Sequence, residues 1–504
     1  MAITIKARKL IEVSIIVFWI LMMGLLFSRE IVSNHRISAY RPFLSKNTLL
    51  SDQWLGIYFN NSPVGFVHTS IEPHIIEKGI SGYRVTNRTL MNFLLLRKRN
   101  KVWFNAEAIV DDDYQLVKFH FELNSGLHKM TVKGYVSDKK IMELEINSQG
   151  EISKRKILLP KKEGVIIASI ISPFNSFGEL KVGAKYALKV FNPFSLELEA
   201  LDIEVTHKEM FERQGLSQEA FVVKSEYRGL IQTAWINDKG EILKEETPMG
   251  WVLLKEDADT ASHTYSTIMS NDTELEDLVS LSSNVVLASS DLNYLKIKLT
   301  GIEDGFSLLS QRQKIIGEDS GQNSKIIEIV KENPDLLPAL TIPIDAQKEF
   351  QAESDFIQIN NSQIKAQARQ IIKDEKDSFA AAKKINQWVF ENIRKVPVVS
   401  IPSAIDVFKT KEGDCNEHAV LFAALARCVG IPTKINVGLA YSQGRFYYHA
   451  WCSVYVGQWV DIDPTFGEDI ANPAHIKLIE GDLNKQLDVV RLIGKIKLEV
   501  IDYK

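Results

Sequence analysis

The stretch GDCNEHAVLFAALARCVGIP, residues 413–432, decides the fold of the C-terminal part of this chain. Residues 419–429 are apolar on nearly every side, and Gly430 and Pro432 follow them as a helix stop signal. The stretch therefore predicts a buried helix. Cys415 lies at or just before its first residue, where unpaired N–H groups and the positive end of the helix dipole favour the thiolate form of cysteine.

The residues after this helix predict three strands, with His449 on the second and Asp463 at the end of the third. Their side chains meet only if both project from one sheet face. A two-residue turn at 457–458 would put them on opposite faces, whereas a three-residue turn or a bulge at Gly457 restores the register. Asp461 projects from the same sheet face as Asp463 but lies closer to the turn, so Asp463 is the favoured partner of His449. The strands span residues 433–441, 446–456 and 459–463.

These residues predict nucleophilic thiol chemistry. Cys415 attacks a carbonyl, His449 accepts the thiol proton and returns it to the leaving group, and Asp463 orients the imidazole. His418 is only three residues from Cys415 and is interpreted as a supporting residue rather than as the base.

The chain holds three cysteines, and Cys428 and Cys452 are both predicted to pack in the core. No CxxC pair and no His-x₃-His pattern accompanies them, so neither a zinc site nor a cofactor is expected.

The motifs resemble the bacterial transglutaminase-like superfamily over about 100 residues. They are Gly-Asp-Cys at 413–415, Gly-Ile-Pro at 430–432, His-Ala-Trp at 449–451 and Trp-x₃-Asp-Pro-Thr at 459–465. The resemblance implies a papain-like α+β core with Cys415, His449 and Asp463 as its triad. Family members include transglutaminases, thiol peptidases, amidases and non-enzymatic scaffolds. Animal transglutaminases have Trp after the nucleophile where this chain has Asn416, so calcium-dependent cross-linking is not implied.

Charge and hydropathy bear on partners and location. The 60 basic and 64 acidic residues nearly cancel, and no nucleic-acid partner is expected.

Residues 10–27 are apolar apart from Glu12 and follow a basic flank, which predicts a transmembrane anchor; a cleaved signal peptide is the alternative. With that flank in the cytoplasm, the protein would be a single-pass inner-membrane protein with residues after 28 on the periplasmic side.

The predicted fold class is α+β, with an N-terminal transmembrane helix, an antiparallel β-rich region and a C-terminal papain-like transglutaminase core. Alternating apolar residues, as in 117–123, predict the β-rich region, and three- and four-residue spacing predicts two helices after residue 361. The predicted segments are a cytoplasmic tail at 1–9, the anchor at 10–27, a stalk at 28–51, the β-rich domain at 52–257, a smaller β-containing unit at 258–360 and the transglutaminase-like domain at 361–504.

The leading functional hypothesis is a membrane-anchored enzyme that forms a thioester at Cys415 from a peptide or isopeptide amide. Hydrolysis, as in a cysteine peptidase or amidase, is favoured over amine transfer, because water is the default acceptor and no amine pocket is visible in the sequence. The expected partner is a peptide or protein substrate in the cell envelope. The alternative is a non-enzymatic envelope binding or adaptor protein that acts through its β-rich region.

Overall fold

Strands dominate the N-terminal half of the chain. The computed structural model describes residues 51–504 except 77–79, 113–114, 138–139, 160–164, 168–179, 262–272, 289–291, 320–322, 399, 482–484 and 486. Among the described residues from 51 to 256 there are fifteen strands. They are β1 Ser51–Phe59, β2 Ser62–Ile76, β3 Ile80–Leu95, β4 Lys98–Asp111, β5 Leu116–Ser125, β6 His128–Ser137, β7 Ile141–Ser148, β8 Glu151–Leu158, β9 Val165–Ile167, β10 Lys185–Asn192, β11 Glu197–Arg213, β12 Leu216–Tyr227, β13 Leu230–Ile236, β14 Ile242–Glu246 and β15 Trp251–Glu256.

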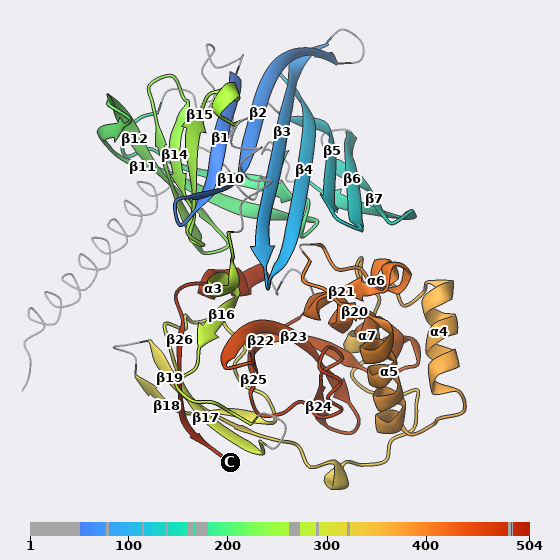
Figure 1. Cartoon of the computed structure of the whole chain (residues 1–504). Helices are drawn as coiled ribbons and strands as arrows, with labels where there is room; N and C mark the ends of the chain where they lie inside the picture. Colours follow the sequence, from blue (N-terminus) through green and yellow to red (C-terminus); the bar gives the residue numbers. More distant parts are fainter. Residues whose placement is uncertain are drawn as a thin grey trace, which may run out of the picture.

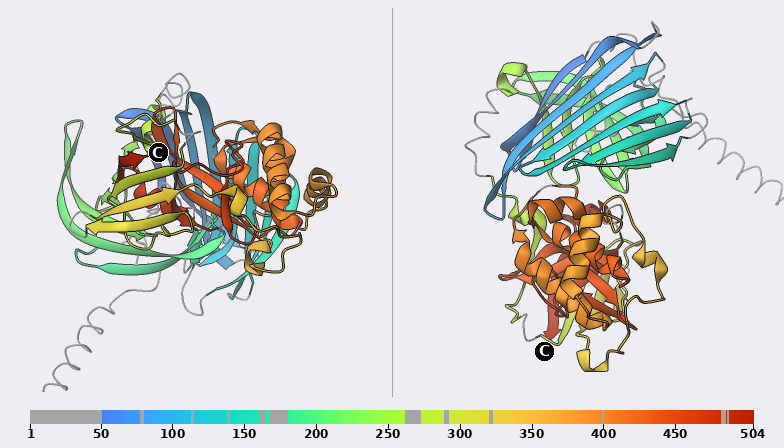
Figure 2. Two further views of the ribbon diagram at one scale, coloured as in Figure 1. Left: turned by 90° about the horizontal axis from the view of Figure 1, so that it is seen from below. Right: turned by 90° about the vertical axis from the view of Figure 1, so that its right-hand side faces the viewer.

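These strands form one curved sheet, the β lobe, which is the upper part of the molecule in Figure 1. The order is β8-β7-β6-β5-β4-β3-β2-β1-β15-β14-β13-β12-β11-β10-β9. Neighbours are antiparallel except β9 and β10, which are parallel. Figure 2 shows the sheet folding over so that β2–β7 lie opposite β10–β13. Its inner face carries the apolar core, where the Phe119 and Phe191 rings lie 5.1 Å apart.

The lower part of the molecule, the α/β lobe, contains the helices that the apolar periodicity predicts. The helices that surround the second core are α4 Ser362–Ile372, α5 Ser378–Asn392, α6 Ala404–Thr410 and α7 Cys415–Cys428. In Figure 1 the α7 helix lies between the other helices and the strands of this lobe, and its buried alanine and leucine side chains explain why residues 419–426 are apolar on every side.

Helix α7 packs against a sheet in the order β16-β23-β22-β25, with β24 beside β23. The strands are β16 Ser280–Ser282, β22 Thr433–Ser442, β23 Arg445–Tyr455, β24 Trp459–Ile462 and β25 His475–Glu480. A further sheet has the order β18-β19-β17-β26, so the last strand of the chain pairs with β17. Its strands are β17 Tyr294–Thr300, β18 Gln313–Asp319, β19 Ser324–Val330 and β26 Lys497–Tyr503.

The remaining elements are short. They are α3 Glu276–Val279, the 3₁₀ turns Pro334–Leu336, Lys348–Gln351 and Leu487–Leu492, and the parallel pair β20 Arg394–Lys395 and β21 Glu412–Gly413.

Two predictions need correction. The α+β class with a transmembrane helix is wrong, because the described chain is mainly β and its longer helices are confined to the α/β lobe. The sequence interpretation recognised several alternating runs but not one continuous sheet. The predicted single-pass membrane location is also contradicted, since no helix among the described residues is long and apolar enough to cross a bilayer. Residues 10–27, the predicted anchor, lie outside the described residues.

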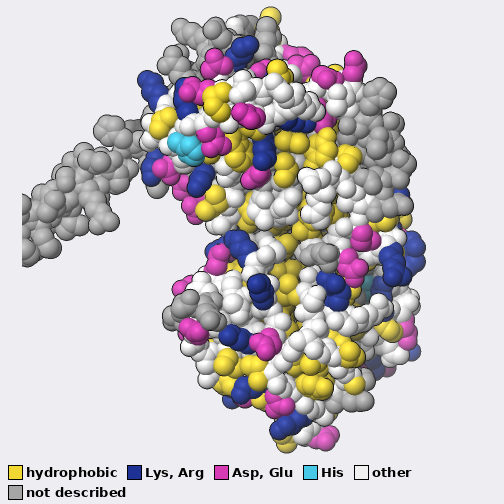
Figure 3. Space-filling view, turned by 60° about the vertical axis from the view of Figure 1, so that its left-hand side comes forward, with side chains coloured by type: hydrophobic (Ala, Val, Ile, Leu, Met, Phe, Trp, Pro, Cys, Tyr) yellow, Lys and Arg dark blue, Asp and Glu magenta, His cyan; other side chains and the backbone are white. Residues whose placement is uncertain are grey.

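Side-chain contacts join the two lobes. Arg155 of β8 pairs with Asp355 at 2.8 Å, and Lys409 of α6 pairs with Glu151 at 2.8 Å. Asp406 of α6 is buried at this contact and accepts a hydrogen bond from Ser148. On the face in Figure 3, basic and acidic side chains are interspersed over both lobes.

The lobe contact predicts a pH dependence of stability. Burial raises the pKa of Asp406 to about 6, although the Ser148 hydrogen bond opposes this shift. The folded state therefore holds this proton more tightly than the unfolded state, and stability falls as pH rises from about 4 to 6. We expect Asp406→Asn to be more stable than the natural protein above pH 6, by up to about 3 kcal/mol, and no more stable at pH 4.

Urea unfolding at pH 4 and pH 7.5 measures this difference. Asp355→Asn is the matched control, because it removes a partly exposed interface carboxylate whose pair with Arg155 contributes little. Equal stability of Asp406→Asn and the natural protein at pH 7.5 would contradict the assignment.

Candidate active site

Cys415 is the first residue of α7, as the sequence predicts, and the preceding residue caps the helix. The Asp414 carboxylate accepts a hydrogen bond from the N–H of Asn416 at 2.9 Å, and Glu417 accepts one from the N–H of Asp414 at 2.9 Å. This capping box requires Gly413, because a Cβ there would lie 2.2 Å from the Glu417 Cβ. The nucleophile candidate thus stands at a rigid helix start.

The electrostatics at Cys415 differ from the sequence expectation. Burial raises the pKa of the Cys415 thiol well above its ordinary value, and the Asp414 carboxylate raises it further. A backbone hydrogen bond with Ala450 acts in the opposite direction. The helix N-terminus is therefore not sufficient to ionise the thiol. That hydrogen bond places Cys415 beside β23, at the residue that follows His449 in the chain.

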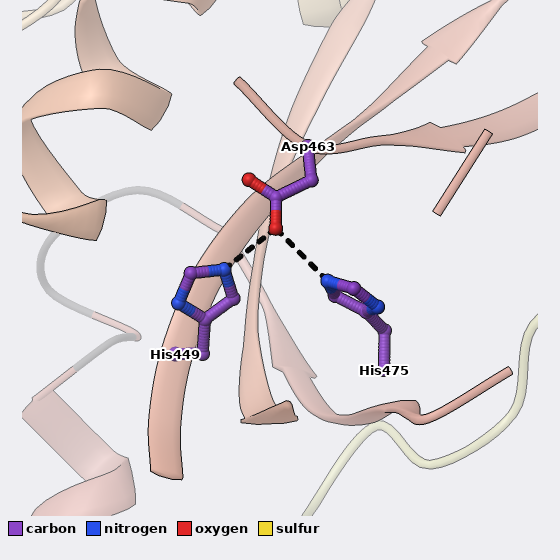
Figure 4. Close-up of side chains that lie close together, drawn as sticks. All are labelled: His449, Asp463 and His475. Atoms are coloured by element: carbon purple, nitrogen blue, oxygen red, sulfur yellow. Dashed lines mark hydrogen bonds and ion pairs between the residues drawn. The ribbon is translucent and has the colours of Figure 1, made fainter. Parts of the chain in front are cut away.

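The hairpin between β23 and β24 has the register that the triad hypothesis requires. Tyr455 lies opposite Trp459, so three residues form the turn, and Cys452 lies opposite Ile462. His449 and Asp463 consequently project from the same face. Their side chains meet: His449 Nε2 lies 2.7 Å from Asp463 Oδ2. Figure 4 shows the other ring nitrogen of His449, Nδ1, pointing away from Asp463.

The Asp463 carboxylate accepts hydrogen bonds on both oxygens. Oδ2 bonds the Nε2 atoms of His449 and His475, and Oδ1 bonds the backbone N–H groups of Thr465 at 2.6 Å and Phe466 at 3.0 Å. Burial alone would raise the pKa of Asp463, but the His449 charge and the hydrogen bonds from both histidines lower it well below the ordinary range. Asp463 therefore stays ionised in acid as well as at neutral pH.

His475 is a member of the cluster that the sequence interpretation missed. Its Nε2 lies 2.9 Å from Asp463 Oδ2, its Nδ1 lies 3.2 Å from the Asn472 carbonyl oxygen, and the carboxylate raises the pKa of His475 despite burial. Figure 4 shows both imidazoles turned toward one oxygen. The sequence signal that could have pointed to His475 was its position as a polar residue in the largely apolar run 474–479. Its partner was hidden because β25 pairs with β22, not with β24.

Gly438 of β22 lies between the two histidines and permits this approach. It pairs with His449 on one side and with Lys477 on the other, at a register shift in the β22–β25 ladder. A Cβ at Gly438 would lie 1.9 Å from the Ile476 carbonyl oxygen, so only glycine allows β25 to come this close.

His449, Asp463 and His475 also have donor atoms suited to a transition metal, and these atoms lie within 4.8 Å of one another. Both Nε2 atoms, however, lie at hydrogen-bonding distance from one carboxylate oxygen. A nitrogen that binds a metal has no proton to donate to this oxygen. The geometry therefore favours hydrogen bonds from both histidines to Asp463 over a metal site.

The other sequence candidates lie around this cluster. Asp461 bonds Ser453 at 2.5 Å and Trp451 at 3.1 Å, which places its carboxylate on neighbouring side chains rather than on His449. His418 is buried and bonds the Asp414 carbonyl oxygen at 2.6 Å, in keeping with a supporting position.

The two remaining thiols pack in the core of the α/β lobe, as predicted. Cys452 is fully buried and bonds the Ala419 carbonyl oxygen of α7, and Cys428 bonds that of Ile359 at 3.0 Å.

Residues 365–464 match the family model of the transglutaminase-like superfamily, so the chain contains a transglutaminase-like domain. No curated protein matches the sequence. Solved structures with some similarity include a candidate cysteine protease from Cytophaga hutchinsonii, at 16% identity over 42% of this chain and 86% of that one, with a TM-score of 0.31. A β-barrel-like protein from Brucella abortus is 8% identical over 41% and 95% of the two chains, with a TM-score of 0.27.

The site predicts a role for His475 in positioning Asp463. We expect His475→Leu to slow alkylation of Cys415 about tenfold, because Asp463 loses a charge-assisted hydrogen bond and orients His449 less well. His475→Gln, which keeps an N–H donor, should recover most of the rate. Iodoacetamide labelling followed by mass spectrometry across pH 5 to 9 measures both variants. A His475→Leu profile identical to that of the natural protein would contradict the role.

Proposed function

We propose that this protein is a thiol acyl-transfer enzyme that acts on peptide or isopeptide amides and passes the acyl group to water. The observation that carries the proposal is the buried His449–Asp463 pair at 2.7 Å. His449 lies on β23, and the next residue of that strand, Ala450, hydrogen-bonds the Cys415 thiol at the start of α7. The match to a transglutaminase-like domain supports the same chemistry.

In the first half of the reaction, His449 Nδ1 accepts the Cys415 thiol proton as the sulfur attacks the amide carbon. Asp463 holds the imidazole by its Nε2–H and stabilises the imidazolium that forms. The tetrahedral intermediate then expels the amine, which takes the proton from His449, and a thioester remains on Cys415. The backbone N–H of Cys415, at the start of α7, is the proposed oxyanion donor.

In the second half, a water molecule attacks the thioester while His449 accepts one of its protons. Collapse of that intermediate releases a carboxylic acid, and the proton returns to the Cys415 sulfur. Because burial raises the pKa of the Cys415 thiol, we propose that the resting nucleophile is the protonated thiol and that its proton transfers as the sulfur attacks.

One charge favours water over an amine as the acceptor. Lys395 is close enough for its ammonium group to interact electrostatically with Asp463. This positive charge disfavours the approach of a second cation, and a lysine acceptor in water is an ammonium ion that would have to approach the site and lose a proton before it could attack the thioester.

Substitution of the nucleophile tests the proposal. We expect Cys415→Ala to lower peptide hydrolysis by about 10³-fold or more, because the covalent route is lost. Cys428→Ser is the matched control and should retain activity, since that thiol packs away from the triad.

The assay incubates each variant with a peptide library and a labelled amine, and mass spectrometry distinguishes free acid from amide. Accumulation of labelled amide instead of acid would contradict hydrolysis. Equal product formation by Cys415→Ala and the natural protein would contradict the proposal that the protein is a thiol enzyme, and would favour a binding role.

A further inference from the structure

Two exposed phenylalanine rings lie beside the candidate triad. Phe390 is 37% exposed and Phe466 is 36% exposed. Single exposed apolar residues are common on proteins and need no function. Phe466, however, stacks on the His449 ring, with centroids 4.6 Å apart and planes inclined by 13°. An exposed aromatic ring thus covers one face of the proposed base.

Phe390 is brought to the same place by helix α5. Gly467 follows Phe466 and has φ +74°, and a Cβ there would lie 2.8 Å from the Phe390 ring. One turn earlier on α5, the buried Asn386 amide bonds Asp469 Oδ1 at 3.0 Å, which ties the helix to the same loop. Phe390 and Phe466 therefore flank Gly467, and we call this pair the aromatic shelf.

A cation lies over the Phe390 ring of the aromatic shelf. Lys395 Nζ lies 3.8 Å from the centroid of the Phe390 ring. Lys395 pairs with Gly413 in the parallel β20–β21 ladder, so its backbone is adjacent to the segment that leads into Cys415. Burial lowers the pKa of Lys395 and the Asp463 charge opposes this shift, in keeping with a position near the triad.

These features form a surface that reaches from α5 to the reacting groups. About a third of each ring stays exposed to water, and a cation over an exposed ring contributes little to folding stability. A substrate would gain from both parts, because an apolar side chain would cover the rings and a carboxylate would face Lys395.

We propose that the aromatic shelf and Lys395 form a substrate subsite, which selects peptides with a large apolar side chain next to a carboxylate near the scissile amide. The inference rests on the proposed function, since it names the substrate class of the same site. The side chain would lie on Phe390 and Phe466, and the carboxylate would pair with the Lys395 ammonium. Covering the rings would also exclude water from the His449 ring and strengthen its hydrogen bond to Asp463.

Thiol reagents of different charge test the cationic part without knowledge of the natural substrate. The full chain is labelled with iodoacetate or with iodoacetamide, and the rate at Cys415 is measured by mass spectrometry. We expect Lys395→Gln to lower the iodoacetate-to-iodoacetamide rate ratio about fivefold, as loss of one nearby charge predicts. Lys383→Gln is the matched control, because Lys383 also lies over a ring of α5, Phe379, at 5.3 Å.

Reagents of different apolar size test the aromatic part. Phe390→Leu should lower the ratio of N-phenylmaleimide to N-ethylmaleimide rates at Cys415 about threefold, because it removes a ring–ring contact. Phe379→Leu should leave this ratio unchanged. Both ratios compare reagents on one variant, so a general loss of thiol reactivity cancels.

The outcomes separate the two proposals. Fast labelling of Cys415 with either ratio unaltered by its variant would overturn the subsite and leave the enzyme intact. Labelling of Cys415 no faster than that of Cys428 with every reagent would overturn the proposed function and the subsite together.

Discussion

The architecture of the candidate site depends on one buried carboxylate. Asp463 is fully buried, a position that ordinarily costs an ionised group several kcal/mol. Four donors offset this cost: two imidazole Nε2–H groups and two backbone N–H groups. Because the donors come from β23, β25 and the loop after β24, the requirement to satisfy this carboxylate fixes three segments relative to one another.

The sequence predicted part of this arrangement because strand parity is a local property. His449 and Asp463 can share a face only with a three-residue turn or a bulge at Gly457, and in the structure three residues separate the paired positions Tyr455 and Trp459. His475 could not be found by the same argument. Its strand joins the sheet beyond β22, and its approach depends on the missing side chain of Gly438. Such contacts follow from the order of strands, which spacing along the chain does not determine.

The same distinction explains the errors in the fold class. Helices α4 and α5 were predicted after residue 361 from their apolar spacing, and α7 was predicted from its buried run and the stop signal that follows it. The β lobe was recognised as strand-rich from alternation, but its first strand closes against its last, as β1 pairs with β15. That pairing joins residues about 200 positions apart. No local pattern predicts it, and no periodicity predicts that β17 pairs with the C-terminal strand β26.

The capping of α7 shows how a structural device alters chemistry. An acidic N-cap stabilises a helix start, since its carboxylate satisfies orphan N–H groups and complements the helix dipole. At this helix the same carboxylate, Asp414, stands next to the proposed nucleophile and raises the pKa of Cys415 together with burial. The helix terminus alone therefore cannot supply the thiolate. In the proposed mechanism the thiol proton passes to His449, which Asp463 orients, so the proposal makes reactivity at Cys415 depend on the hydrogen bonds that hold Asp463.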